Sequence, residues 1–216
     1  MKVIILGVFL LVTLPSAAQD IIVDDPFVGL TPVEKEALRI KQLLSMETKM
    51  GISVNVPDNL YPITKHVPAP CRSSALDYLF VNADSSLLIT IALMPKDSLE
   101  YEQDVLYYSR FLSYRDYLPD RAWENNLKAM ADSTLFKPIF YSGQKLKAYN
   151  ADVGVEFMKR ECETLYLDTY KCTRAIILYR KYRGMVQIHY FVSDKKGVDA
   201  SPYIRNGAQM ISFYEK

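Results

Sequence analysis

The residue types that perform most acid–base and metal chemistry are scarce in this chain. It contains two histidines, His66 and His189, which are too few for a typical zinc site unless several carboxylates join them. His189 alternates with Gln187 on the more polar side of an apolar strand pattern, which predicts a surface position. His66 falls in a proline-rich segment, where we expect a structural or solvent-facing side chain. Neither histidine is predicted to be catalytic or to bind a metal.

Nucleophile and phosphate-binding motifs are also missing from the sequence. Gly-x-Ser-x-Gly and His-Glu-x-x-His do not occur, and Ser-x-x-Lys occurs only at Ser142 with Lys145 and at Ser193 with Lys196. Both matches lie in turn-like stretches and lack the Ser-Asp-Asn and Lys-Thr-Gly motifs that accompany a β-lactamase-type site. The glycines are dispersed and never form Gly-x-Gly, so no phosphate-cradling loop is predicted. We therefore predict no catalytic residue, no cofactor and no metal site.

The amino terminus has the three parts of a secretory signal peptide. Lys2 gives the basic start, an apolar run follows over residues 3–14, and small side chains stand at Ser16 and Ala18. The run is too short to cross a hydrocarbon core of about 30 Å as a helix, although a retained membrane anchor is the alternative. We predict cleavage after Ala18, a mature chain that begins at Gln19, and a secreted or periplasmic location with no membrane span after processing.

Three cysteines remain after this cleavage, Cys71, Cys162 and Cys172, and none forms a Cys-x-x-Cys motif. In an oxidising compartment a disulfide is the expected state of a close pair. Cys162 follows a strand candidate at 153–160 and Cys172 precedes another at 173–180. Antiparallel pairing of these strands would bring the two Cα atoms toward the roughly 5.5 Å that a disulfide requires. We predict a Cys162–Cys172 disulfide and an unpaired Cys71.

Charge and length limit the classes of protein that fit. Loss of Lys2 with the signal peptide leaves 25 basic and 25 acidic side chains from the 26 and 25 of the whole chain. A neutral balance argues against nucleic-acid binding, which needs a basic surface to release counterions. We predict a signal peptide over 1–18, a leader or linker over 19–30 and a single domain over 31–216.

Helical and strand periods alternate along that domain. Thr31, Pro32 and Glu34 predict the capped start of a helix ending near Lys49, whose stripe of Val33, Ala37, Ile40 and Leu44 should face inward. A strand should follow at 52–56. The prolines from 57 to 72 favour an extended crossing segment over a ladder strand.

The later elements are inferred in the same way. We expect a hairpin of 75–81 with 87–94, a helix capped by Asp97 and Glu100, and a helix from Asp120 with Trp123, Leu127 and Met130 inward. Short strands are expected at 135–141, 145–149, 153–158, 173–180 and 185–192, and a last helix from Ser201 with Ile204, Ala208 and Ile211 inward. Short turns between successive strands make the sheet mainly antiparallel. The fold class is therefore α+β, with helices packed on that sheet.

Several of these pieces together resemble the PsbP-like family. They are a strand opening with Gly51-Ile-Ser-Val-Asn-Val-Pro57, the central hairpin, the late meander, and a terminal helix ending in Met210-Ile-Ser-Phe213. The resemblance covers about residues 50–214, and Asn59-Leu60 stands where such sequences often carry Gly-Trp. It implies an antiparallel sheet between helical layers, an α/β/α layered sandwich, and an accessory, partner-binding role. No functional residue is carried over.

Tyrosine is the unusual residue of this composition, with 16 copies. Tyr107, Tyr108, Tyr114 and Tyr117 crowd one helical segment, and they are too many for one inward stripe. Tyrosine combines an apolar ring with a polar tip and is enriched in recognition surfaces. Tyr107, Tyr114 and Tyr117 are therefore a possible interface, and a buried seam between helices is the alternative.

Two hypotheses of function follow from different classes of protein. The first is a non-catalytic binding or accessory protein of the periplasm or cell envelope, whose partner is another envelope or extracellular protein. The second is a secreted, hydrolase-like enzyme with a site assembled from scattered polar residues, because active sites need spatial and not sequential proximity. The missing site chemistry favours the first.

Overall fold

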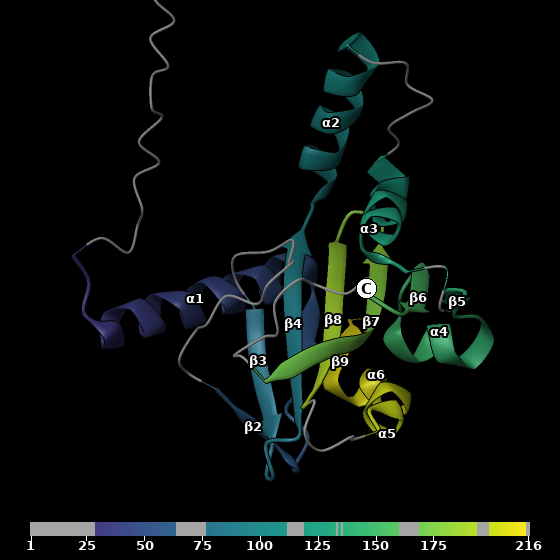
Figure 1. Cartoon of the computed structure of the whole chain (residues 1–216). Helices are drawn as coiled ribbons and strands as arrows, with labels where there is room; N and C mark the ends of the chain where they lie inside the picture. Colours follow the sequence, from purple (N-terminus) through teal and green to yellow (C-terminus); the bar gives the residue numbers. More distant parts are fainter. Residues whose placement is uncertain are drawn as a thin grey trace, which may run out of the picture.

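The computed structural model describes residues 29–63, 77–111, 119–132, 134, 136–159, 169–193 and 199–214 (Figure 1). The predictions for the signal peptide, the leader up to residue 28, His66, Cys71, Cys162, Tyr114 and Tyr117 lie outside these residues. Among the described residues, none of the helices combines the length and the apolar character that crossing a membrane would require.

A seven-stranded sheet forms the centre of the described structure, and every strand pair in it is antiparallel. Its order is β2 (Leu60–Pro62), β3 (Asp77–Asn82), β4 (Leu87–Pro95), β8 (Gly184–Ser193), β7 (Tyr170–Arg180), β6 (Val153–Phe157) and β5 (Ile139–Phe140). A two-stranded sheet joins β1 (Ile52–Val54) to β9 (Ile211–Phe213). Helices and a mainly antiparallel sheet confirm the predicted α+β class.

The strands β4 and β8 lie at the middle of the sheet and are covered on both faces. Successive side chains of a strand point to opposite faces, yet seven consecutive residues from Leu87 to Leu93 are buried. Ile91 of β4 pairs with Ile188 of β8. The doubly apolar pattern of this segment predicted a central strand, and the structure confirms it.

Helices pack on both faces of the sheet. The first face, which carries Ile89, Leu178 and Ile188, meets α1 (Pro32–Met50), α4 (Gly143–Tyr149), α5 (Ser201–Arg205), α6 (Gly207–Met210) and the β1–β9 pair. The second face, which carries Val155 and Ile177, meets α3 (Ala122–Met130), which follows the short 3₁₀ helix η1 (Pro119–Arg121). As predicted, Trp123, Leu127 and Met130 of α3 pack inward on this face.

The start of α1 is as predicted, but its inward side is not. Thr31 and Glu34 form a complete capping box, and Gly51 ends the helix in the left-handed conformation, with φ 60°. The buried side chains are Arg39, Leu43 and Met50. The stripe that begins at Val33 was expected to face inward, but it lies in solvent. The helix carries two sets of apolar side chains, and the sheet covers the set that includes Leu43 and Met50.

Three further expectations are corrected by the structure. Residues 143–149 form α4 and not a strand; Leu146 packs against the core three positions before the buried Tyr149, which is helical spacing. Residues 211–213 leave the last helix because β1 offers them a partner, with Ile52 paired to Phe213. The segment after Pro57 was expected to contain no ladder strand, yet β2 pairs with β3 at the sheet edge, where Pro62 is tolerated.

Candidate functional site

The helix α2 (Ser98–Phe111) projects beyond the end of the sheet that β4 leaves (Figure 1). None of its side chains from Ser98 to Arg110 is buried. Leu99, Leu106 and Tyr107 are each more than half exposed, and together they are called the α2 apolar surface here. A surface helix normally buries one apolar stripe against the rest of its protein. The apolar side chains of α2 are instead left in solvent.

The predicted tyrosine interface falls partly on this surface. Tyr107 is exposed, and its ring meets that of Tyr108 edge to face, with 5.1 Å between centroids. Tyr108 and Tyr101 belong to the half-buried side of the helix. Because Tyr114 and Tyr117 lie outside the described residues, the full tyrosine interface stays a prediction.

Polar contacts hold the first turns of α2 in place. Asp97 and Glu100 form the predicted reciprocal cap, with the Asp97 N–H 3.0 Å from the Glu100 carboxylate and the Glu100 N–H 2.9 Å from the Asp97 carboxylate. Lys49 at the end of α1 pairs with both acids, at 3.3 Å and 2.8 Å. Lys96 pairs with Asp104 one turn further along. The base of α2 is therefore fixed to α1 and β4.

A second set of contacts, the Tyr101 cluster, ties α2 to the turn between β7 and β8. It consists of Tyr101, Asp120, Lys181 and Tyr182. The rings of Tyr101 and Tyr182 meet edge to face at 5.0 Å, and the Lys181 ammonium lies 5.1 Å from each ring centroid and 3.2 Å from Asp120. Burial, followed by a hydrogen bond to Asp120, raises the pKa of Tyr101 to about 12. This phenol therefore stays neutral and acts as a packing ring.

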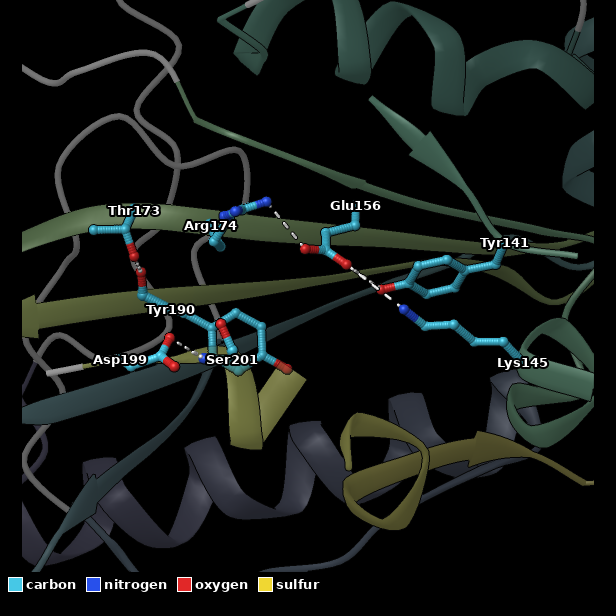
Figure 2. Close-up of polar contacts among 8 residues, drawn as sticks. All are labelled: Tyr141, Lys145, Glu156, Thr173, Arg174, Tyr190, Asp199 and Ser201. Atoms are coloured by element: carbon cyan, nitrogen blue, oxygen red, sulfur yellow. Dashed lines mark hydrogen bonds and ion pairs between the residues drawn. The ribbon is translucent and has the colours of Figure 1, made fainter. Parts of the chain in front are cut away.

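On the first face of the sheet, polar side chains converge on the carboxylate of Glu156 (Figure 2). The Tyr141 hydroxyl donates to one oxygen at 3.3 Å, and Lys145 of α4 lies 3.6 Å from the same oxygen. Arg174 of β7 donates to the other oxygen at 3.1 Å. Glu156 is buried whereas the two cations are partly exposed. The single negative charge of Glu156 therefore offsets only one of the two positive charges of Lys145 and Arg174.

Aromatic rings support both cations of this group. The Lys145 ammonium lies 3.7 Å from the ring centroid of Tyr141, and the Arg174 guanidinium lies 4.1 Å from that of Phe136. Burial is the main cause that raises the pKa of Tyr141, with Tyr149 and Glu156 adding to it. The Ser-x-x-Lys match at Ser142 and Lys145 therefore has a structural explanation, since Ser142 precedes the first turn of α4 and Lys145 pairs with Glu156.

Two further tyrosines lie behind Glu156 in the core. Burial is again the main cause that raises the pKa of both Tyr149 and Tyr190, and Glu156 adds to it. A Cβ built on Gly207 would clash with the Tyr149 hydroxyl and lie 3.4 Å from the Tyr190 hydroxyl. Among the described residues the buried Tyr190 hydroxyl has no hydrogen-bond partner. The absence of a side chain at Gly207 thus leaves room for the Tyr149 hydroxyl.

His189 was predicted at the surface, and this prediction is wrong. It is buried on the second face of the sheet in a directed chain of hydrogen bonds. The Lys159 ammonium lies 3.2 Å from Nδ1, Nε2 lies 3.3 Å from the Gln187 carbonyl oxygen, and the Gln187 amide donates to Asn126 of α3 at 3.1 Å. Because the ammonium can only donate, Nδ1 accepts and Nε2 carries the proton.

The surroundings of His189 keep its ring neutral. Burial, followed by the nearby Lys159 charge, lowers the pKa of His189 to about 3. A ring with so low a pKa does not take up a proton near neutral pH, which is what a general base must do. The neutral ring orients Gln187, whose amide makes the contact with Asn126 of α3.

Among the described residues Cys172 has no disulfide partner; its side chain is partly buried, and its Sγ lies 3.8 Å from the Arg174 carbonyl oxygen. Burial raises its pKa to about 12. The strands proposed to flank the disulfide do pair antiparallel, with Phe157 opposite Ala175. Cys162 lies outside the described residues, so the predicted Cys162–Cys172 disulfide stays a prediction.

Glu156, Lys159 and Arg174 were not singled out in the sequence. Glu156 occupies the polar position of an alternating strand, which normally indicates solvent, and Gln187 does the same in β8. Helices on both faces bury these positions. The sequence already predicted helices packed on the sheet. In such a sheet, a polar residue that alternates with apolar neighbours in a strand indicates a buried polar group with a partner, and this signal could have identified Glu156 and Gln187.

Comparisons with protein-family models, with curated proteins and with solved structures found no match to this chain. The resemblance to the PsbP-like family therefore rests on sequence features and stays a prediction.

Proposed function

We propose that this protein is an exported, non-catalytic binding or accessory protein of the periplasm or cell envelope. It contacts another envelope or extracellular protein through the α2 apolar surface. The observation that carries the proposal is that α2 presents Leu99, Leu106 and Tyr107 to solvent while none of its side chains up to Arg110 is buried. Apolar groups clustered on a projecting element mark interaction sites more often than scattered ones do.

The way α2 is held supports this proposal. Its first turns are fixed by Lys49 and by the Tyr101 cluster, so little backbone entropy is lost when its outer side is covered. Burying each of the three side chains in a partner would contribute about 1.5–3 kcal/mol. Tyrosine is also typical of the residues that dominate binding energy in interfaces.

The polar groups elsewhere support a non-catalytic role. Glu156 is engaged by three donors, and His189 is neutral and enclosed between Lys159 and Gln187. In both arrangements the buried group is already held by protein partners, whereas acid–base and nucleophilic catalysis need a group that a substrate can reach.

The test is a photo-crosslinking residue at Leu106, compared with the same residue at Tyr214, an exposed position outside α2. We expect one envelope protein to crosslink at Leu106 and not at Tyr214. Replacing Tyr107 or Leu99 with alanine should weaken that crosslink at least several-fold while the thermal midpoint changes little, because these side chains are exposed. Equal crosslinking at both sites would refute the proposal.

Export is tested separately. Amino-terminal sequencing of the chain recovered from the periplasm or medium should give Gln19 as the first residue. An intact Met1, or a chain that stays with the membrane after a carbonate wash, would contradict the exported location.

One observation favours the alternative of a secreted, hydrolase-like enzyme. The Glu156 carboxylate meets the phenol hydroxyl of Tyr141 and the cations of Lys145 in α4 and Arg174 in β7, as a site built from scattered residues would. If Glu156 is catalytic, Glu156→Gln should abolish a hydrolytic activity found by substrate screening and leave α2-dependent crosslinking intact. Activity that survives this change would exclude Glu156 from catalysis.

A further inference from the structure

A second apolar surface lies along α1. The side chains of Val33, Ala37, Ile40 and Leu44 follow each other at intervals of four, three and four residues, which puts them on one side of a helix within about 60°. Val33 is 79% exposed, Ile40 42% and Leu44 54%, and Ala37 is exposed as well. This set is called the α1 stripe.

The α1 stripe is separate from the side of α1 that meets the sheet. That side is formed by Arg39, Leu43 and Met50 and points about 120° away around the helix axis, at 100° per residue. In Figure 1 the amino-terminal half of α1 runs past β3 and beyond the edge of the sheet. A helix laid on the stripe would therefore not have to displace the sheet.

We propose that the α1 stripe pairs antiparallel with the same stripe of a second copy of this chain. A two-fold axis between residues 37 and 40 makes the contact self-complementary. It sets Val33 of one copy opposite Leu44 of the other, and the small Ala37 opposite the larger Ile40. Alternation of small and large side chains across the axis is how antiparallel helices interdigitate.

Charges beside the stripe are complementary under the same symmetry. Glu34 and Lys41 flank the stripe on one side of the helix, and both are exposed. The two-fold axis brings Glu34 of each copy next to Lys41 of the other, so the pair occurs twice. Flanking charges of this kind set the orientation of paired helices.

The size of the stripe predicts a weak, reversible dimer. From Val33 to Leu44 the helix rises about 17 Å, and four side chains per copy cover less than the roughly 800 Å² per partner of a standard interface. We therefore expect a dissociation constant of about 10 μM to 1 mM. This association involves α1 and is independent of the α2 apolar surface.

Sedimentation velocity of the mature chain from about 10 μM to 1 mM should show the mass rising toward that of two copies. Ile40→Glu should keep the chain monomeric, and Tyr214→Glu, which introduces the same charge at an exposed aromatic residue outside α1, should leave the dimer intact. A wild-type chain that stays monomeric at the highest concentration, or that dimerises as well with Ile40→Glu, overturns the proposal.

The orientation is tested by mixing two charge variants. A Glu34→Lys chain carries two lysines beside its stripe and a Lys41→Glu chain carries two glutamates, so each alone should dimerise at least several-fold more weakly than wild type in low salt. Glu34→Lys also removes the side chain that completes the cap with Thr31, so Glu34→Gln, which can keep that cap but not the charge, is its control. Their equimolar mixture should recover the wild-type affinity, because every flanking pair is then of opposite charge. A mixture no stronger than its components overturns the antiparallel pairing.

A third measurement distinguishes two ways of covering the α1 stripe: pairing with a second copy, and packing of another segment of the same chain. If another segment of the same chain packs on the α1 stripe, Ile40→Glu should lower the thermal midpoint of the dilute monomer by several degrees. If a second copy covers it, the midpoint at low concentration should fall by no more than about a degree or two, because Ile40 is already 42% exposed in the single chain. A large loss at low concentration therefore overturns the proposal.

Discussion

Tyr182 adopts left-handed backbone, with φ 61°, while its ring packs edge to face on Tyr101 of α2 at 5.0 Å between centroids. That conformation costs a residue with a side chain about 1–2 kcal/mol, and a bulky side chain rarely adopts it. An aromatic pair stabilises by about 0.5–1.5 kcal/mol. The two contributions are therefore of similar size and opposite sign, and the turn places a ring against the base of α2.

Tyr182→Gly tests this relationship. The loss of backbone strain and the loss of the ring contact should nearly cancel, so the thermal midpoint should change by only a few degrees. Hydrogen exchange of the α2 amides should nevertheless become faster, because the helix loses one of its attachments. Tyr182→Phe keeps the ring and should behave as wild type. Unchanged exchange in α2 after Tyr182→Gly would show that the ring does not hold the helix.

The unpartnered hydroxyl of Tyr190 gives a second prediction. A buried polar group without a hydrogen bond costs about 1–3 kcal/mol, so Tyr190→Phe should leave the free energy of unfolding unchanged or raise it by about 1 kcal/mol. The matched control is Tyr141→Phe, which removes a hydroxyl that donates to Glu156 and should lower stability by about 1–3 kcal/mol. Denaturant unfolding of both variants measures the difference. A destabilised Tyr190→Phe would mean that its hydroxyl is bonded to water.

Gly207 gives a third prediction through its close approach to Tyr149. In most helices Gly→Ala stabilises by up to about 1 kcal/mol, but here the added Cβ would meet the Tyr149 hydroxyl. Gly207→Ala should therefore destabilise by about 1–3 kcal/mol, as overpacking does. In a Tyr149→Phe background the loss should be smaller by at least about 1 kcal/mol. Tyr190→Phe should give less relief, since its hydroxyl lies farther from the built Cβ.

Much of the fold could be predicted because the local pattern and the final environment agree. The cap at Thr31 and Glu34, the doubly apolar strand from Leu87 and the inward side of α3 all follow from short-range rules. The elements that were missed depend on distant partners. Residues 211–213 become a strand only because β1 lies beside them, and a seven-residue helix such as α4 is too short for its period to be distinguished from a strand.

The candidate sites were less predictable than the fold, for a related reason. The sequence shows that α1 has enough apolar positions for two stripes, but only the packing decides that Leu43 faces the sheet and Ile40 does not. Alternation in β8 predicted solvent for His189, and the same rule applied to β6 would place Glu156 in solvent as well. Helices on both faces bury them instead, and a single sequence does not indicate which polar groups will meet one another there.

The last prediction concerns the pH dependence of folding through His189. Its pKa is about 3 in the folded chain and about 6.5 when unfolded, so between these values the unfolded chain binds the additional proton. The stability contributed by a neutral His189 is therefore complete above pH 6.5 and is lost as the pH falls toward 3. The loss should reach about 2 kcal/mol at pH 5. Unfolding free energies measured from pH 7 to 4.5 should fall more steeply for wild type than for His189→Gln, whose side chain does not titrate. Equal slopes would show that the ring accepts a proton in the folded chain.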